Sequence, residues 1–293
     1  MGIPIEYYTF AVSFSSNMKI ITLTTDFGLR DYSVAAVKGA LYNKCPNATI
    51  VDISHYISPF NILETFYILQ NSYMHFPKGS IHIIGVDTER TATKKHLLMS
   101  LNGHYFIGAD NGIFHLLSEN CTNVTLYEFD TQPSTPLFPT LYSFTSIAEQ
   151  IYKGTPLNQI GIPIEKCNSV SYFKPEVSTD ENFIHGIIIY IDHYGNAVSN
   201  ISRSLFERIQ QNRKFEVIFK MFSFRKIYNQ YSDIINFNCP PESRATPDGE
   251  GMLLFNDLNY LQFSIYKSDR RSVGGASSLF GMDYYDRVSV HFL

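Results

Sequence analysis

The stretch Lys19-Ile-Ile-Thr-Leu-Thr-Thr-Asp26-Phe27-Gly28 decides how the rest of the chain is interpreted. An apolar strand ends in a carboxylate and a glycine turn, and a helical pattern follows from Ser33. This order places Asp26 at the carboxyl end of a strand, where open α/β sheets bind small ligands. The stretch contains neither G-x-G-x-x-G nor the P-loop pattern, so its carboxylate suits the two hydroxyls of a ribose better than a phosphate. Alternatively, Asp26 and Ser33 only cap the helix.

The composition limits the class of protein. The 293 residues are 44% hydrophobic and 17% charged, which is typical of a compact globular protein with one large or two ordinary domains. The net charge of −4 provides no basic field for nucleic acid or an acidic membrane, and the apolar runs are too short for a membrane span. Four scattered cysteines without C-x-x-C argue against a disulfide framework or structural zinc and favour the cytoplasm.

The patterning predicts an α/β fold with two domains. Strand and helix patterns alternate in the first half, so we expect a layered α/β domain with a mainly parallel sheet over residues 18–173. Short strands dominate the second half, so we expect an antiparallel β-barrel domain over residues 183–293. Residues 1–17 lack a signal-peptide pattern and are expected to be a loose N-terminal extension, or to precede a true start at Met18.

Two more strand ends in the first half carry carboxylates. Asp52 and Asp87 each follow a predicted strand, as Asp26 does. The carboxyl ends of strands in one sheet converge on one edge, so these carboxylates are expected near one another. His55 follows Asp52 closely and is more simply interpreted as a structural histidine.

A polar segment follows the most regular strand of the second half, Asp192-His-Tyr194-Gly-Asn196. Tyr194 can stack on an aromatic base, and Asn196 can pair with an adenine edge. The alternative is an ordinary hairpin turn with Gly-Asn at its tip.

Together these segments resemble the S-adenosylmethionine (SAM) hydrolases, or SAM hydroxide adenosyltransferases, the family that also contains the fluorinating and chlorinating enzymes. The resemblance implies an N-terminal α/β domain, a C-terminal β-barrel, and trimers whose substrate lies between the N-terminal domain of one subunit and the C-terminal domain of the next. The matching stretches are Thr24-Thr-Asp26-Phe-Gly28 with Asp31, Val51-Asp-Ile-Ser-His55, Ile57-Ser-Pro-Phe60, Phe76-Pro-Lys-Gly79, Val86-Asp87, Ala109-Asp-Asn-Gly112, Tyr190-Ile-Asp192-His-Tyr-Gly-Asn196, Ser199-Asn-Ile201, and Glu250-Gly through Asn256 to Tyr260-Leu261.

The resemblance also implies substrate-binding roles. Asp26 would hold the ribose 2′- and 3′-hydroxyls. The other implied positions are Asp31, Ser33 and Asp192 near the amino acid group of SAM, Tyr194 and Asn196 at adenine, backbone groups of Asn256, Asp257 and Leu258 at the adenine edge, and Phe60 and Phe138 beside the reacting carbon.

The family is expected to handle the attacking water with an Asp-Arg-His set, and this chain departs from it. Asp87 matches the Asp, whereas Lys94 stands at the Arg position and Pro139 at the His position. Lys keeps a positive charge without the bidentate fork of Arg, and Pro supplies no base. Asp87 is therefore expected to activate water with help from Lys94, Arg90 or Thr140, the last of which aligns with a Ser of the fluorinating enzymes.

The resulting expectation is a cytoplasmic SAM hydrolase that attacks the ribose C5′ with water and releases adenosine and methionine. The sulfonium leaves as a neutral thioether, so the protein must anchor the ribose, align the water and exclude bulk solvent, without a metal or other cofactor. A non-catalytic SAM or adenosine binder is the first alternative, because Pro139 removes the expected base. A SAM-dependent halogenase is less favoured, because the charge of Asp87 would repel a halide.

Overall fold

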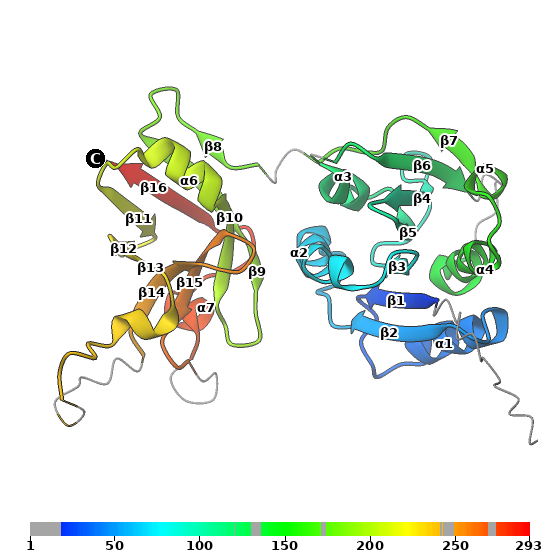
Figure 1. The fold of residues 1–293 in the computed structure, drawn as a ribbon, viewed down its shortest axis with the longest axis horizontal. Helices are drawn as coiled ribbons and strands as arrows, with labels where there is room; N and C mark the ends of the chain where they lie inside the picture. Colours follow the sequence, from blue (N-terminus) through cyan, green and yellow to red (C-terminus); the bar gives the residue numbers. More distant parts are fainter. Residues whose placement is uncertain are drawn as a thin grey trace, which may run out of the picture.

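The computed structural model describes residues 19–119, 121–129, 136–170, 174–240, 242, 249–268 and 274–293. The expectations for residues 1–17 and for a start at Met18 lie outside these residues. Two sheets organise the described chain, one from each half of the sequence (Figure 1). The α/β class and the division into two sheets are therefore confirmed.

The first sheet has seven strands in the order β2-β1-β3-β5-β4-β6-β7. Their bounds are β1 (Ile20–Thr25), β2 (Thr49–Ser54), β3 (Ile81–Gly85), β4 (His96–Leu101), β5 (His104–Ala109), β6 (Val124–Phe129) and β7 (Ile162–Ile164). The pairs β1·β2, β1·β3 and β3·β5 are parallel, but β4·β5, β4·β6 and β6·β7 are antiparallel. The sheet is thus mixed rather than mainly parallel, because the Asn102-Gly103 turn folds β4 and β5 into a hairpin and the later strands extend its antiparallel side.

Helices cover both faces of this sheet (Figure 1). Helices α1 (Ser33–Lys44) and α4 (Thr145–Lys153) pack together over β1 and β3. Helices α2 (Ile62–Ser72) and α3 (Ile113–Ser118) pack together on the opposite side. A π-helical turn, η2 (Thr140–Phe144), leads into α4, and the short elements η1 (Tyr73–His75) and α5 (Leu157–Ile160) complete this half. The layered arrangement leaves the carboxyl ends of β1 and β3 accessible at one edge.

The second sheet has nine strands in the order β12-β11-β16-β9-β10-β15-β14-β13, with β8 beside β9. Their bounds are β8 (Glu176–Val177), β9 (Phe183–Ile191), β10 (Ala197–Ser202), β11 (Phe215–Phe219), β12 (Phe222–Phe224), β13 (Ile227–Tyr228), β14 (Gly251–Phe255), β15 (Tyr260–Ile265) and β16 (Arg287–Phe292), and α6 (Arg203–Gln210), η3 (Tyr231–Ile234) and α7 (Ala276–Leu279) accompany them. All pairs are antiparallel except β13·β14. Within the described residues the path ends at β12 and β13, so a closed barrel remains a prediction.

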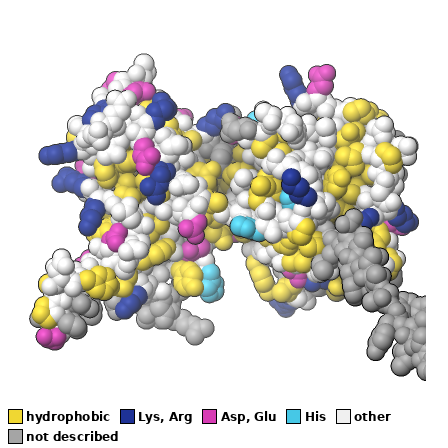
Figure 2. Space-filling model, viewed as in Figure 1, with side chains coloured by type: hydrophobic (Ala, Val, Ile, Leu, Met, Phe, Trp, Pro, Cys, Tyr) yellow, Lys and Arg dark blue, Asp and Glu magenta, His cyan; other side chains and the backbone are white. Residues whose placement is uncertain are grey.

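The two halves contact each other along α2. Its Tyr67 ring stacks on Tyr190 of β9 with centroids 4.3 Å apart, and the core beneath α2 and α3 continues to Ile189 and Val198. The domain limits at residues 173 and 183 remain predictions. No helix among the described residues is long and apolar enough to cross a membrane, and acidic side chains lie among the basic ones on the face drawn in Figure 2.

Candidate active site

A cleft of about 350 Å3 lies where β1 and β3 end. Three of the predicted positions meet there, since Asp26 and Asp87 follow the two strands and Phe60 comes from the loop before α2. Pro139, which stands where the resemblance implies a His, also lines the cleft. The strand-end argument is therefore confirmed for the proximity of Asp26 and Asp87. The remaining lining residues are Phe27, Gly85, Thr88, Glu89, Arg90, Pro136 and Leu137.

Asp26 is held by the loop that precedes α2. The Phe60 N–H donates to Asp26 Oδ2 at 3.0 Å, and Phe60 adopts a left-handed φ of 62° to do so. Burial raises the pKa of Asp26, the N–H groups of Phe60 and of Asp26 itself lower it, and the charge of Asp87 raises it. Helix α1 begins after Tyr32 with no side-chain cap. The alternative in which Asp26 and Ser33 only cap this helix is therefore wrong.

Asp87 forms an ion pair with Lys94. Lys94 Nζ lies 2.5 Å from Asp87 Oδ1, and both side chains are largely shielded from solvent, with 18% and 29% exposed. Arg90, the other cation considered from the sequence, instead contacts Glu128 Oε1 at 3.3 Å. Lys94, which stands where the resemblance implies an Arg, is thus the cation that pairs with Asp87.

The loop that carries both residues is fastened by two asparagines that the sequence analysis did not single out. Asn111 Nδ2 donates to the carbonyls of Val86 (3.1 Å) and Asp87 (3.4 Å), which holds Asp87 in its left-handed conformation at φ 46°. Asn168 Nδ2 donates to the Thr93 carbonyl at 2.9 Å, next to Lys94. The Asp-Asn-Gly turn motif could have drawn attention to Asn111, whereas the segment around Asn168 contains no recognisable motif.

The floor of the cleft is closely packed around Gly85. A Cβ on Gly85 would lie 2.8 Å from Thr25 Cγ2, 3.1 Å from the Phe27 ring and 3.3 Å from Thr140 Cγ2. Thr140 is fully buried, and its hydroxyl has no hydrogen-bond partner within the described part of the chain. Phe138 lies behind the cleft, edge-on to Phe27 with ring centroids 5.4 Å apart. Thr140 and Phe138 therefore lie behind the lining residues Gly85 and Phe27, and their roles in the site stay predictions.

A second group of predicted residues surrounds a different cavity, of about 420 Å3. Asp192 lines it together with the segment from Asn256 to Leu258 and with Tyr67 of α2. Asn256 Nδ2 donates to the Tyr67 hydroxyl at 3.0 Å, while Asn256 Oδ1 accepts the N–H groups of Leu258 (3.1 Å) and Tyr260 (3.0 Å). The side chain of Asn256 thus links the two halves of the chain. Within one chain this group lines a cavity separate from the Asp26 cleft.

The segment around Asn196 joins β9 and β10 in a hairpin, but its tip is formed by His193 and Tyr194 rather than by Gly-Asn, because the Gly195 N–H donates to the Asp192 carbonyl. The binding roles of Tyr194 and Asn196 stay predictions. Asp192 Oδ1 accepts the Asn196 N–H at 2.8 Å, and Asp192 Oδ2 accepts from Asn196 Nδ2 at 2.7 Å. Asn196 Oδ1 is buried without a partner among the described residues, and the side chain of Tyr194 is 63% exposed. Asp31 is exposed and Ser33 half-buried, and these two line neither cavity.

Both ring nitrogens of His55 contact other side chains of the fold. Its Nδ1 lies 2.8 Å from Thr25 Oγ1, and its Nε2 lies 3.0 Å from Asp52 Oδ1. Asp52 also binds Lys38 at 2.5 Å. Burial raises the pKa of Asp52, but the hydrogen bonds from Lys38 and His55 outweigh it and lower the pKa. Asp52 and His55 therefore brace the end of β1 from outside the cleft.

Comparison with known proteins agrees with this architecture. The family model for the SAM hydroxide adenosyltransferase N-terminal domain matches residues 21–161, and the model for the C-terminal domain of the same family matches residues 186–289. The chain belongs to the SAM hydroxide adenosyltransferase family.

Relatives within and around this family cover most of the chain. It is 27% identical over 289 residues to the (R)-S-adenosyl-L-methionine hydrolase of Methanocaldococcus jannaschii, with 93% of this chain and 96% of that protein aligned. It is 28% identical over 219 residues to a fluorinase of an Actinoplanes species, covering 64% of this chain and 74% of that protein. An uncharacterised conserved protein from Thermotoga maritima shares the fold, with a TM-score of 0.76 at 21% identity over 93% of this chain and 99% of that chain.

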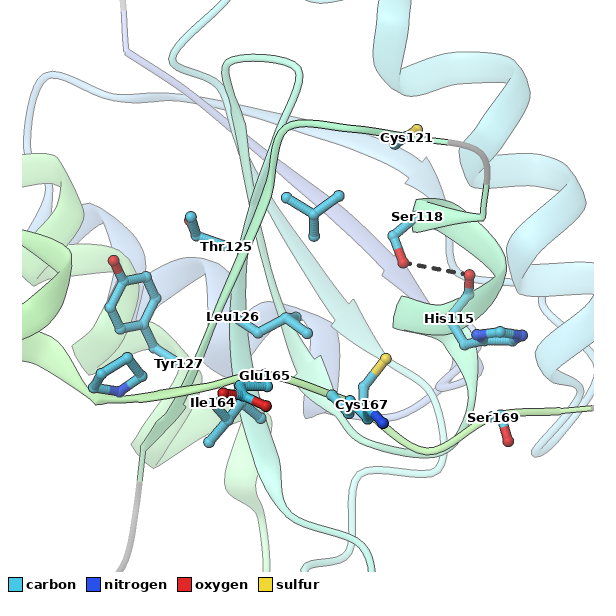
Figure 3. Close-up of a pocket in the computed structure, with 13 residues that line it drawn as sticks. His115, Ser118, Cys121, Thr125, Leu126, Tyr127, Ile164, Glu165, Cys167 and Ser169 are labelled. Carbon is cyan, nitrogen blue, oxygen red and sulfur yellow. Dashed lines mark hydrogen bonds between the residues drawn. The ribbon is translucent and has the colours of Figure 1, made fainter.

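A further cavity of about 740 Å3 lies between α3, β6 and the segment after β7 (Figure 3). Cys121 and Cys167 line it with His115 and Glu165. Neither cysteine forms a disulfide, and burial, reinforced by the charge of Asp110, raises the pKa of Cys167 to about 11. No group of three or more His, Cys, Asp or Glu is placed to hold a metal ion in the part of the chain that the structure describes. The cavity contains none of the residues predicted for the SAM site.

Proposed function

We propose that this member of the SAM hydroxide adenosyltransferase family hydrolyses SAM to adenosine and methionine. The observation that supports it most is the Asp87–Lys94 ion pair at the cleft that also holds Asp26. A carboxylate paired with a cation preserves two parts of the water-handling set, although Pro139 occupies the place of the third. The names of the hydrolase relatives point to the same reaction.

The proposed chemistry follows from the atoms available in the cleft. Asp26 accepts hydrogen bonds from the ribose hydroxyls, which fixes C5′ relative to β1. Lys94 occupies Asp87 Oδ1, which leaves Oδ2 to accept a proton from the attacking water. The water oxygen bonds to C5′ while the C5′–S bond breaks, and the electron pair leaves on the neutral thioether of methionine. We propose that the Thr140 hydroxyl, which has no hydrogen-bond partner among the described residues, helps to orient the water.

The complete site is proposed to form between copies of the chain. Asp26 and Asp87 line one cavity, and Asp192 lines another with the Asn256–Leu258 segment. In a homotrimer the second group of one subunit would face the cleft of the next, where Asp31, Ser33, Tyr194 and Asn196 would contribute to binding SAM. No metal or organic cofactor is needed, because a neutral leaving group requires neither acid nor Lewis-acid assistance. A cytoplasmic location stays a prediction.

The test is turnover of SAM by the purified protein, followed by mass spectrometry of adenosine and methionine with and without chloride. We expect equal amounts of both products. Asp87→Asn, which keeps the size of the side chain, should lower turnover by about 100-fold or more, because general-base catalysis contributes ~10²–10⁴-fold. Adenosine binding to this variant, measured by calorimetry, should stay close to wild type. Undiminished turnover in Asp87→Asn would remove Asp87 from the mechanism.

Asp26→Ala should show the opposite pattern and weaken adenosine binding by roughly 1–3 kcal/mol, about 5- to 150-fold, through lost charged hydrogen bonds. The assay also separates the alternatives. SAM that binds but is recovered intact would indicate a non-catalytic binder with Pro139 as the reason. A 5′-chlorinated nucleoside in the presence of chloride would indicate a halogenase.

A further inference from the structure

Glu64 is a carboxylate in the first turn of α2 that the proposed chemistry does not use. Only 6% of the residue is exposed. Burying a carboxylate is costly unless hydrogen bonds compensate for the lost water. The partners of Glu64 therefore indicate what its burial achieves.

The first partner lies in the turn that supports Asp26. Glu64 Oε2 accepts the Ser58 N–H at 2.9 Å, and the Asn61 N–H donates to the Ser58 carbonyl at 3.0 Å, which closes the turn. Phe60 lies inside this turn in its left-handed conformation. A left-handed Phe is an unfavourable backbone state that its surroundings must enforce. Glu64 thus stabilises the turn whose central N–H group binds Asp26 Oδ2.

The second neighbour comes from the turn before β16 in the C-terminal half. Burial and then the nearby charge of Glu64 raise the pKa of Tyr284, and the neighbouring Tyr285 hydroxyl donates to Asn61 Oδ1 at 3.4 Å. The Tyr285 N–H donates to the Ile188 carbonyl of β9 at 2.8 Å, so both tyrosines are tied to that sheet. Asn61 Oδ1 also accepts the Glu64 N–H at 3.0 Å as the cap of α2. The turn at Ser58–Asn61 is therefore held between α2 and the C-terminal half of the same chain.

We infer that Glu64 is a positioning residue, which presents Asp26 to the ribose through the Ser58–Asn61 turn and couples that carboxylate to the C-terminal sheet through Tyr284. This inference rests on the proposed function, because it takes Asp26 to be the ribose ligand. The occupant it serves is a nucleoside with free 2′- and 3′-hydroxyls. Glu64 itself touches no substrate, so its effect should appear in binding and depend on Asp26.

The experiment measures adenosine affinity and SAM turnover for Glu64→Ala and Glu64→Gln. Glu64→Ala should weaken adenosine binding and raise KM for SAM about 10-fold, with kcat changed less than about 3-fold, since the lost contact acts on binding. Glu64→Gln should recover most of the affinity, because its amide can accept from Ser58 and donate to the Tyr284 oxygen. Glu207→Ala, which removes a carboxylate exposed on α6, is the matched control and should bind as wild type does.

A double-mutant cycle separates positioning from general loss of structure. In an Asp26→Asn background, the further effect of Glu64→Ala should shrink to about 2-fold or less, since residues that act through one another are not additive. If Glu64→Ala does not fold, Tyr284→Phe replaces it, with an expected loss in affinity of about 3-fold that also disappears in the Asp26→Asn background. Full additivity, or unchanged affinity in both single variants, would overturn the inference. A wild-type protein that binds neither adenosine nor SAM would instead overturn the proposed function.

Discussion

Lys94 pairs with Asp87 at a position where the resemblance implies an Arg. It keeps the positive charge beside Asp87 but offers a single ammonium in place of a planar fork. Lys94→Met keeps the length of the side chain and removes the charged hydrogen bond. A charged hydrogen bond contributes about 1.5–3 kcal/mol, so we expect kcat to fall about 10- to 150-fold.

Lys94→Arg is the matched variant for this prediction and should retain more activity than Lys94→Met, because it restores a charge at the position. Single-turnover assays with saturating SAM give the comparison directly. If Lys94→Met turns over at the wild-type rate, the ion pair plays no part in the chemistry and Asp87 works alone.

Single residues were predictable where a strand end fixes them. Asp26 and Asp87 follow buried strands that are neighbours in the sheet. The alternation of strand and helix patterns was enough to predict that the ends of these strands lie at the same edge. The contact between Asp87 and Lys94 was not predictable, because it depends on a loop that Asn168 fastens from a segment far along the chain. The burial of Thr140 against Gly85 likewise depends on packing between segments far apart in the sequence.

At the scale of elements, the loop between β3 and β4 controls the geometry of Asp87. Asn111→Asp preserves the shape of Asn111 but presents an acceptor to the carbonyls of Val86 and Asp87, which need a donor. We expect turnover to fall about 10-fold or more, because small misplacements of a reacting group are costly. Adenosine affinity should change about 2-fold at most, since Asp26 is held by a different loop.

Parallel measurements of kcat and of adenosine affinity in Asn111→Asp check this prediction. An equal loss in both would mean that the substitution unfolds the cleft as a whole. Asn168→Ala, which frees the loop near Lys94, should resemble Lys94→Met more than Asn111→Asp.

Helices and strands were predictable where the pattern of apolar residues within one segment determines them. The first strand and the helix that begins at Ser33 were expected close to their observed bounds. The proportion of parallel strands was overestimated, because strand direction in the second part of the first sheet depends on which neighbour each strand pairs with. Local patterning cannot distinguish those pairings, although Asn102-Gly103 is typical of the tight turn that joins β4 and β5.

At the scale of the whole molecule, stability is linked to a buried histidine network that joins β1, β3 and β5 of the first sheet. His82 of β3 is fully buried, with Nδ1 2.7 Å from Thr22 Oγ1 and Nε2 3.1 Å from His104 Nδ1. Burial, reinforced by His104, lowers the pKa of His82 to about 3, and burial also lowers the pKa of His104. Both rings are therefore neutral in the folded protein at neutral pH.

The sign of the pH dependence follows from these lowered values. The unfolded chain binds a proton at His82 near pH 6.5 and the folded chain does not until about pH 3, so folding stability is complete above the unfolded pKa and falls as the pH drops below it. The free energy of unfolding should decrease by about 1.4 kcal/mol per pH unit between roughly pH 6 and pH 4 from His82 alone.

Urea unfolding at a series of pH values measures this slope. His82→Gln should flatten it, whereas His75→Gln, at an exposed position in η1, should leave it unchanged. An identical slope in wild type and His82→Gln would show that His82 is already protonated in the fold, contrary to its burial between β1 and β5.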